Sequence, residues 1–170
     1  MKTYCLRYAL TACLLTLSCA LCAKTHAQQT SPAQQAALPP PAETAIPEAQ
    51  LLQPAQVMQI LRSSNGDRPL ILQVGSRVFY AQAHIPGSEY VGAAGEDSGL
   101  QALRERVKGL ERSRFVIIYC GCCPWNKCPN IRRAYQQLIS LGFTDVKVLY
   151  LSNNFGTNWV AEGYPVAKGR

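Results

Sequence analysis

The sequence predicts an α/β domain with a mainly parallel sheet of about five strands, flanked by helices on both faces. Apolar runs at residues 70–74 and 115–119 have the length and composition of strands buried on both sides. A third run at residues 146–151 has the same character. Amphipathic segments of helical length separate the runs, and this alternation is typical of parallel strands joined by crossover helices.

Each predicted helix has an apolar stripe at helical spacing. The first helix begins at Pro54, a residue that suits a first helical turn. The third is predicted to end at the capping residue Gly142, and a short last helix ends near Gly163. In chain order the stripes are Val57, Ile60 and Leu61; Leu100, Leu103, Val107 and Leu110; Ile131, Ala134, Tyr135, Leu138 and Ile139; and Phe155, Trp159 and Val160.

The N-terminus has the pattern of an export signal, which we expect to be cleaved after Ala27. Lys2 and Arg7 precede an uncharged, mostly apolar run at residues 8–23, which is too short for an ordinary membrane span. The mature protein is therefore expected in the periplasm or outside the cell, without stable membrane insertion. An uncleaved anchor and a lipoprotein processed at Cys13 are the alternatives that the pattern leaves open.

Loss of the signal at residues 1–27 changes both charge and cysteine content. The full chain has 17 Lys and Arg, 10 Asp and Glu, and eight cysteines. The mature chain keeps 14 basic and 10 acidic residues, and this formal charge of +4 is too mild to indicate nucleic-acid binding. His84 is its one histidine, which excludes sites built from several histidines. Its four cysteines lie between residues 120 and 128, and export would expose them to oxidation.

Residues 28–47 are predicted to be a linker, and residues 48–170 a single globular domain. The linker contains five Pro, five Ala and four Gln, and Glu43 is its only charged residue. Such a stretch has little to bury and favours extended conformations. A spacer between the domain and the cell envelope and a disordered remnant both fit this composition. The sequence indicates no oligomeric state.

The segment CGCCPWNKCPN, residues 120–130, is the candidate active-site loop. Cys120 directly follows a predicted central strand, and reactive groups of parallel sheets gather beyond the carboxyl ends of the strands. Loop N–H groups and the positive end of the next helix are expected to favour its thiolate, the nucleophilic form. Lys127, Arg132 and Arg133 add positive charge that would attract an anionic sulfur donor, although a solvated helix face explains the two arginines equally well.

Several segments together resemble the rhodanese family of single-domain sulfurtransferases. They occur in the family's order over nearly all of residues 50–167: LILQV, YAQAHIPGS, VIIYC, SLGF, VKVLYL and NNFGTNW followed by GYPV. The resemblance implies that Cys120 takes up a sulfane sulfur as a persulfide and passes it to a thiophilic acceptor. The implied partners are small sulfur donors and thiol acceptors, and no cofactor is implied.

The sequence departs from this family around the active site. The family usually has Asp, and often Arg and Glu, at the positions that Gln73, Gly75 and Phe79 occupy here. The loop is also longer than usual and lacks a compact cradle that ends in Arg. It contains Gly121, Pro124, Trp125, Asn126, Lys127 and the additional cysteines Cys122, Cys123 and Cys128.

The additional cysteines leave three interpretations open. One of them can attack a persulfide or a sulfenate on Cys120 and leave a disulfide; Cys128 is the first choice, before Cys123 and Cys122. Disulfides that only rigidify the loop are the second interpretation, although strain disfavours a bond between the adjacent Cys122 and Cys123. In the third, the thiolates of all four cysteines bind a soft metal such as zinc or copper.

The remaining singled-out residues are expected to serve the structure. His84 lies in a turn that packs near the sheet in the resembling family, and no acid is placed to form a Cys–His–acid triad with it. Phe155 and Trp159 are expected in the core, whereas Trp125 either covers the reactive thiol or packs on the surface. Gly121 is expected to allow a close backbone approach.

Overall fold

The computed structural model of the protein describes residues 45–63 and 68–169. The predicted signal at residues 1–27 and residues 28–44 of the predicted linker lie outside these described residues. Within the two described ranges, no helix combines the length and the apolar character that crossing a bilayer requires.

A five-stranded, all-parallel sheet forms the centre of the domain, which confirms the predicted fold class. Strand β4 lies in the middle of the sheet between β5 and β2, and all residues of β2 and β4 are buried. Burial on both faces explains why these strands are continuous apolar runs. In sheet order the strands are β1 (Leu51–Leu52), β5 (Val146–Leu149), β4 (Val116–Tyr119), β2 (Leu70–Gln73) and β3 (Glu89–Tyr90).

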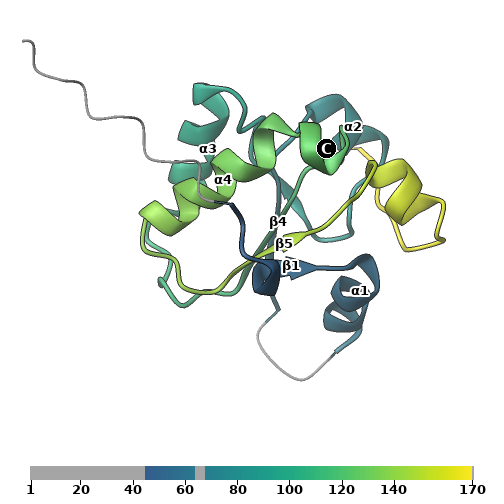
Figure 1. Ribbon diagram of the computed structural model, residues 1–170, viewed down its shortest axis with the longest axis horizontal. Coiled ribbons are helices and arrows are strands. Elements are labelled where there is room, and N and C mark those ends of the chain that lie inside the picture. Colours follow the sequence, from purple (N-terminus) through teal and green to yellow (C-terminus); the bar gives the residue numbers. More distant parts are fainter. Residues whose placement is uncertain (1–44, 64–67, 170) are drawn as a thin grey trace, which may run out of the picture. The chain divides into compact units, whose positions relative to one another are not determined.

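Helices cover both faces of this sheet, as Figure 1 shows. Helices α3 (Asp97–Val107) and α4 (Pro129–Ser140) pack on one face, and α1 (Pro54–Arg62) packs on the other with the π-helical turn η3 (Gly156–Val160). The remaining elements are α2 (Arg77–Gln82) and the short 3-10 turns η1 (Glu48–Gln50) and η2 (Trp125–Lys127).

The alternation of side chains along β4 decides where the loop cysteine points. Ile117 and Tyr119 belong to the core on the α1 side, whereas Ile118 and then Cys120 belong to the core beneath α3 and α4. The strand pattern therefore places the thiol of Cys120 inside the domain, at the end of its most buried strand.

The predicted helical stripes are confirmed except at their ends. Helix α3 stops at Val107, so that Leu110 lies beyond it, and Ile139 at the end of α4 is 45% exposed. Gly142 ends α4 as predicted: its φ is +87°, and the next amide, that of Phe143, donates to the carbonyl of Leu138. Helix α2 was not predicted, because its apolar residues do not form a buried stripe.

The close contact between α3 and the chain before it predicts a stability effect. A Cβ atom on Gly99 would overlap the backbone carbonyl of Ala93. We expect Gly99→Ala to lower the free energy of unfolding by about 3 kcal/mol, as overpacking does, although alanine is the better helix former. Denaturant unfolding measures this, with the exposed neighbour Ser98→Ala as a control that shifts stability by less than about 0.5 kcal/mol. A Gly99→Ala protein as stable as wild type would contradict the contact.

Candidate functional site

Cys120 is the buried centre of the candidate site. It follows β4 directly, and 6% of its surface is exposed. Gly75 makes this position possible, because a Cβ atom there would lie 2.8 Å from the Cys120 Sγ atom and 3.6 Å from that of Cys122. Gly75, at a position where the rhodanese family often has Arg, therefore leaves space for these sulfur atoms.

Three cysteine sulfur atoms form a cluster at the end of β4. The Sγ atoms of Cys120 and Cys122 are 3.2 Å apart, those of Cys122 and Cys123 are 3.4 Å apart, and all three lie within 4.8 Å of one another. Cys128 lies outside this group of three but borders a small internal cavity together with Cys120 and Cys123. The four cysteines of the described residues are free thiols, so the loop is here in its reduced state.

Asn130 connects the cysteine cluster to the rest of the domain. Its side chain is buried, and its amide nitrogen donates to the Sγ atoms of Cys120 (3.3 Å) and Cys122 (3.7 Å). Its side-chain oxygen accepts the backbone N–H of Gly95 at 2.7 Å. Asn130 lies at the end of the predicted loop, but a single polar residue at a helix start does not indicate this role in the sequence.

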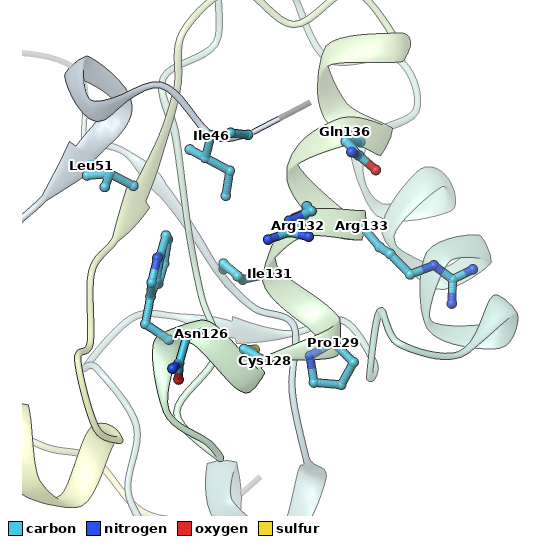
Figure 2. A pocket seen from close by; sticks show the side chains of 11 residues that line it. Ile46, Leu51, Asn126, Cys128, Pro129, Ile131, Arg132, Arg133 and Gln136 are labelled. Carbon is cyan, nitrogen blue, oxygen red and sulfur yellow. The ribbon is translucent and has the colours of Figure 1, made fainter. Parts of the chain in front are cut away.

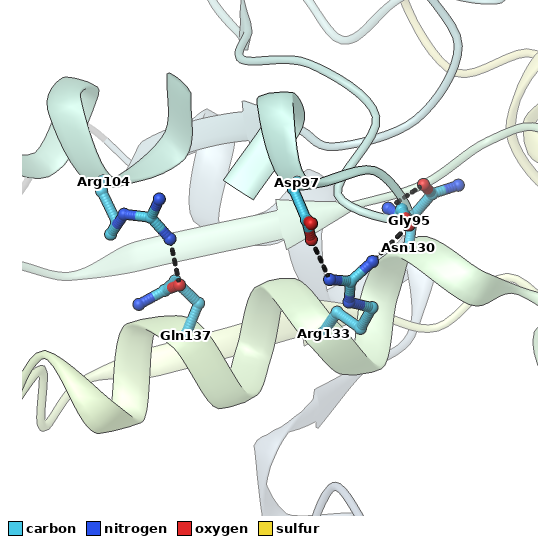
Figure 3. Close-up of polar contacts among 6 residues, drawn as sticks. All are labelled: Gly95, Asp97, Arg104, Asn130, Arg133 and Gln137. Carbon is cyan, nitrogen blue, oxygen red and sulfur yellow. Dashed lines mark hydrogen bonds and ion pairs between the residues drawn. The ribbon is translucent and has the colours of Figure 1, made fainter. Parts of the chain in front are cut away.

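Arg133 holds the start of α4 against the segment at residues 95–97, as Figure 3 shows. Its guanidinium donates to the carbonyl of Gly95 and, at 2.7 Å, to the carboxylate of Asp97. One turn further along α4, Gln137 accepts a hydrogen bond from Arg104 of α3. Arg133 is therefore engaged within the fold.

The protons of the cluster are distributed differently from the sequence-based expectation, which put the thiolate on Cys120. Hydrogen bonds to Cys122 and Cys128, followed by burial, raise the pKa of Cys120 above its ordinary value. The same hydrogen bonds from Cys120 are the main cause that lowers the pKa of Cys122 and of Cys128 to about 6. Burial is the first cause that raises the pKa of Cys123 to about 12.

Backbone N–H groups add to the hydrogen bonds among the sulfur atoms, which are the main cause of this distribution. The backbone N–H groups of Ile131 and Asn130, at the start of α4, donate to Cys128, and that of Ser76 donates to Cys122. The positive end of the helix thus stabilises the thiolate of Cys128, whereas Cys120 has turned into the core and donates its own proton.

Two open cavities lie beside the two thiolates, and they share no lining residue. A cavity of about 480 Å³ lies beside Cys128, with Arg132, Trp125 and Asn126 among its lining residues (Figure 2). A second cavity of about 290 Å³ lies beside Cys122. The internal cavity at Cys120 measures only about 10 Å³, close to the smallest space that holds one water molecule.

The other predicted loop residues have mainly structural contacts. Trp125 is half-buried, packs its ring 4.9 Å from that of Tyr150, and lines the larger cavity. Pro124, Asn126 and Lys127 are exposed. Gly121 does approach another chain segment closely, since a Cβ atom there would lie 2.5 Å from the Cβ atom of Phe155.

His84 is buried and its contacts do not involve a cysteine. Its Nδ1 atom donates to the carbonyl of Tyr80 at 2.8 Å, and its ring stacks on the ring of Tyr80. Its backbone pairs with that of Ala167. These contacts agree with the structural role predicted for it, and Phe155 and Trp159 are buried in the core as predicted.

The described residues form an α/β domain with a thiol cluster beyond its central strand. The family model of the rhodanese-like domain matches residues 53–153, which is more than half of the chain. The protein belongs to the rhodanese-like domain family. A comparison with the curated proteins finds no match.

Solved structures agree with this fold. A protein from Bacillus halodurans is 21% identical with a TM-score of 0.51, covering 69% of this chain and 75% of that one. The rhodanese-like domain of an Anabaena sp. protein is 22% identical with a TM-score of 0.51, covering 70% and 79%. The thiosulfate sulfurtransferase from Pseudomonas aeruginosa is 22% identical with a TM-score of 0.50, covering 71% of this chain but 19% of that protein.

The proton distribution predicts an order of reactivity among the loop thiols. In the reduced protein near pH 7, we expect iodoacetamide to modify Cys122 and Cys128 before Cys120 and Cys123, because only the thiolate reacts. Below pH 6 their rates should fall by about tenfold per pH unit as the two thiolates are protonated. Mass spectrometry of the alkylated peptides measures this order, and modification of Cys120 first would contradict the assignment.

Proposed function

We propose that this protein is an exported sulfurtransferase, located in the periplasm or outside the cell, in which Cys120 carries a persulfide. The observation that carries the proposal is the hydrogen-bonded pair of Cys120 and Cys122 directly beyond β4 of a rhodanese-like domain. A nucleophile beside a group that can accept its proton is the common arrangement of covalent catalysis.

The pair accounts for the chemistry of the first half-reaction. The proton of Cys120 passes to Cys122 as the sulfur atom of Cys120 attacks the sulfane sulfur of the donor, since the two cysteine sulfur atoms are 3.2 Å apart. The new S–S bond forms on Cys120, and the bond between the sulfane sulfur and the rest of the donor breaks. The rest of the donor leaves with the electron pair of the broken bond; with thiosulfate this leaving group is sulfite. The small cavity beside Cys120 has room for about one further atom.

The burial of Cys120 limits the donors that reach it directly. With 6% of its surface exposed, only a small donor such as thiosulfate or a polysulfide fits this step. Cys122 faces the cavity of about 290 Å³, which gives such a donor access to the pair. The export signal would place this chemistry in an oxidising compartment, where a further loop cysteine can resolve an oxidised Cys120 as a disulfide.

A second candidate function is binding of a soft metal ion, and it is favoured by the geometry of three thiols. The Sγ atoms of Cys120, Cys122 and Cys123 lie within 4.8 Å of one another, and thiolates are preferred ligands of Cu(I) and zinc. In that function the loop would hold the metal and transfer no sulfur.

Two serine variants separate the two functions. We expect Cys120→Ser to abolish sulfur uptake from thiosulfate and polysulfide, because the persulfide cannot form on serine. The matched variant Cys123→Ser should keep most of the uptake, because Cys123 has no part in the first half-reaction. Sulfite release and the mass of the intact protein measure the sulfur uptake of both variants.

The opposite results would favour the metal site. If both variants lose bound copper or zinc to the same extent, and wild-type protein takes up no sulfur, the protein is a metal-binding module. Sulfur uptake by Cys120→Ser at the wild-type rate would exclude Cys120 as the carrier.

A further inference from the structure

The larger cavity beside Cys128 has no part in the half-reaction described above. It measures about 480 Å³ and shares no lining residue with the cavity beside Cys122. This volume lies within the range of small-molecule sites in proteins and far exceeds what thiosulfate needs. The domain therefore offers two separate approaches to the cysteine loop, one beside each thiolate.

The lining of the larger cavity combines a positive charge, a thiol and apolar surface (Figure 2). Arg132 lies on the cavity side of α4, whereas Arg133 extends towards Asp97. Ile46, Leu51 and Trp125 supply apolar surface to the same cavity. A ligand that matches this lining is a small organic anion with an apolar part, and the Cys128 thiol at the edge of the cavity selects one that carries sulfur.

Cys128 and the buried carrier Cys120 line the same small cavity. This cavity of about 10 Å³ is bordered by Cys120, Cys123 and Cys128, and it has room for about one atom. Cys120 and Cys128 are also linked by a hydrogen bond, which lowers the pKa of Cys128 to about 6. A sulfur atom held on Cys120 is therefore adjacent to a nucleophile that also reaches the larger cavity.

We infer that the cavity beside Cys128 is the acceptor site, where Cys128 relays the sulfane sulfur from Cys120 to a small thiol whose carboxylate Arg132 binds. This inference rests on the proposed function, because it needs a persulfide on Cys120. It adds the class of the acceptor and a second sulfur carrier.

Both relay steps are simple exchanges. Cys122 first returns its proton to the outer sulfur of the Cys120 persulfide. The thiolate of Cys128 then attacks that sulfur; a bond forms between it and Cys128, and Cys120 leaves as a thiolate. The thiolate of the acceptor then attacks the outer sulfur on Cys128. The acceptor departs as a persulfide that carries the hydrogen, and Cys128 returns to its thiolate. Neither step consumes an oxidant or a reductant.

The test compares two acceptors of similar size, mercaptoacetate with a carboxylate and mercaptoethanol without one. In Arg132→Gln, we expect the KM for mercaptoacetate to rise by about tenfold, since one charge-assisted hydrogen bond is lost, while the KM for mercaptoethanol stays unchanged. Arg62→Gln, an exposed arginine at the end of α1, is the matched control and should change neither KM. Equal effects of Arg132→Gln on both acceptors would overturn the carboxylate site.

A second variant tests the relay with the two half-reactions measured separately. Cys128→Ser should still take up one sulfur atom from thiosulfate, seen in the mass of the intact protein, but should release it to mercaptoacetate at least about tenfold more slowly. Release at the wild-type rate would overturn the relay while leaving the proposed function intact. Wild-type protein that takes up no sulfur would instead overturn the proposed function, and the acceptor site with it.

Discussion

The burial of the end of β4 is the constraint on which the site depends. The side chains of β4 alternate between two cores, and continuing this alternation by one residue turns the thiol of Cys120 beneath α4. A thiolate is costly in such surroundings. Hydrogen bonds to Cys122 and Cys128, followed by this burial, raise the pKa of Cys120 and keep its proton in place, and the negative charge is held by Cys122 and Cys128.

The surrounding residues hold the sulfur atoms of the cysteine cluster in place. Gly75 leaves the space that the sulfur atoms occupy, and Gly121 lets the loop pass against Phe155. Asn130 bridges the cluster to Gly95, and Arg133 clamps the same segment to the start of α4. The N–H groups that stabilise the Cys128 thiolate belong to this helix start, so the packing of α4 against the 95–97 segment also sets the electrostatics of the loop.

The sequence was sufficient for the parts of the fold that depend on local patterns. Continuous apolar runs located β2, β4 and β5, and helical stripes located α1, α3 and α4. Helix α2 gave no such signal, since Val78 and Phe79 on it are exposed. The loop was found because four cysteines lie within it, but the hydrogen bonds that distribute its charge among the sulfur atoms cannot be predicted from the sequence alone. Which sulfur donates and which accepts depends on how side chains from β4, the loop and α4 meet. The partners of Arg133, Gly95 and Asp97, could not be predicted either, because they lie in a distant part of the chain.

The central claim is that the reduced loop holds two thiolates at neutral pH while Cys120 keeps its proton. Titration of the thiolate absorbance in the ultraviolet, on the reduced wild-type protein, tests it most directly. We expect two thiolates from the loop at residues 120–130, with midpoints near pH 6. Four loop thiols that all titrate near the ordinary cysteine value of about 8.5 would contradict this claim.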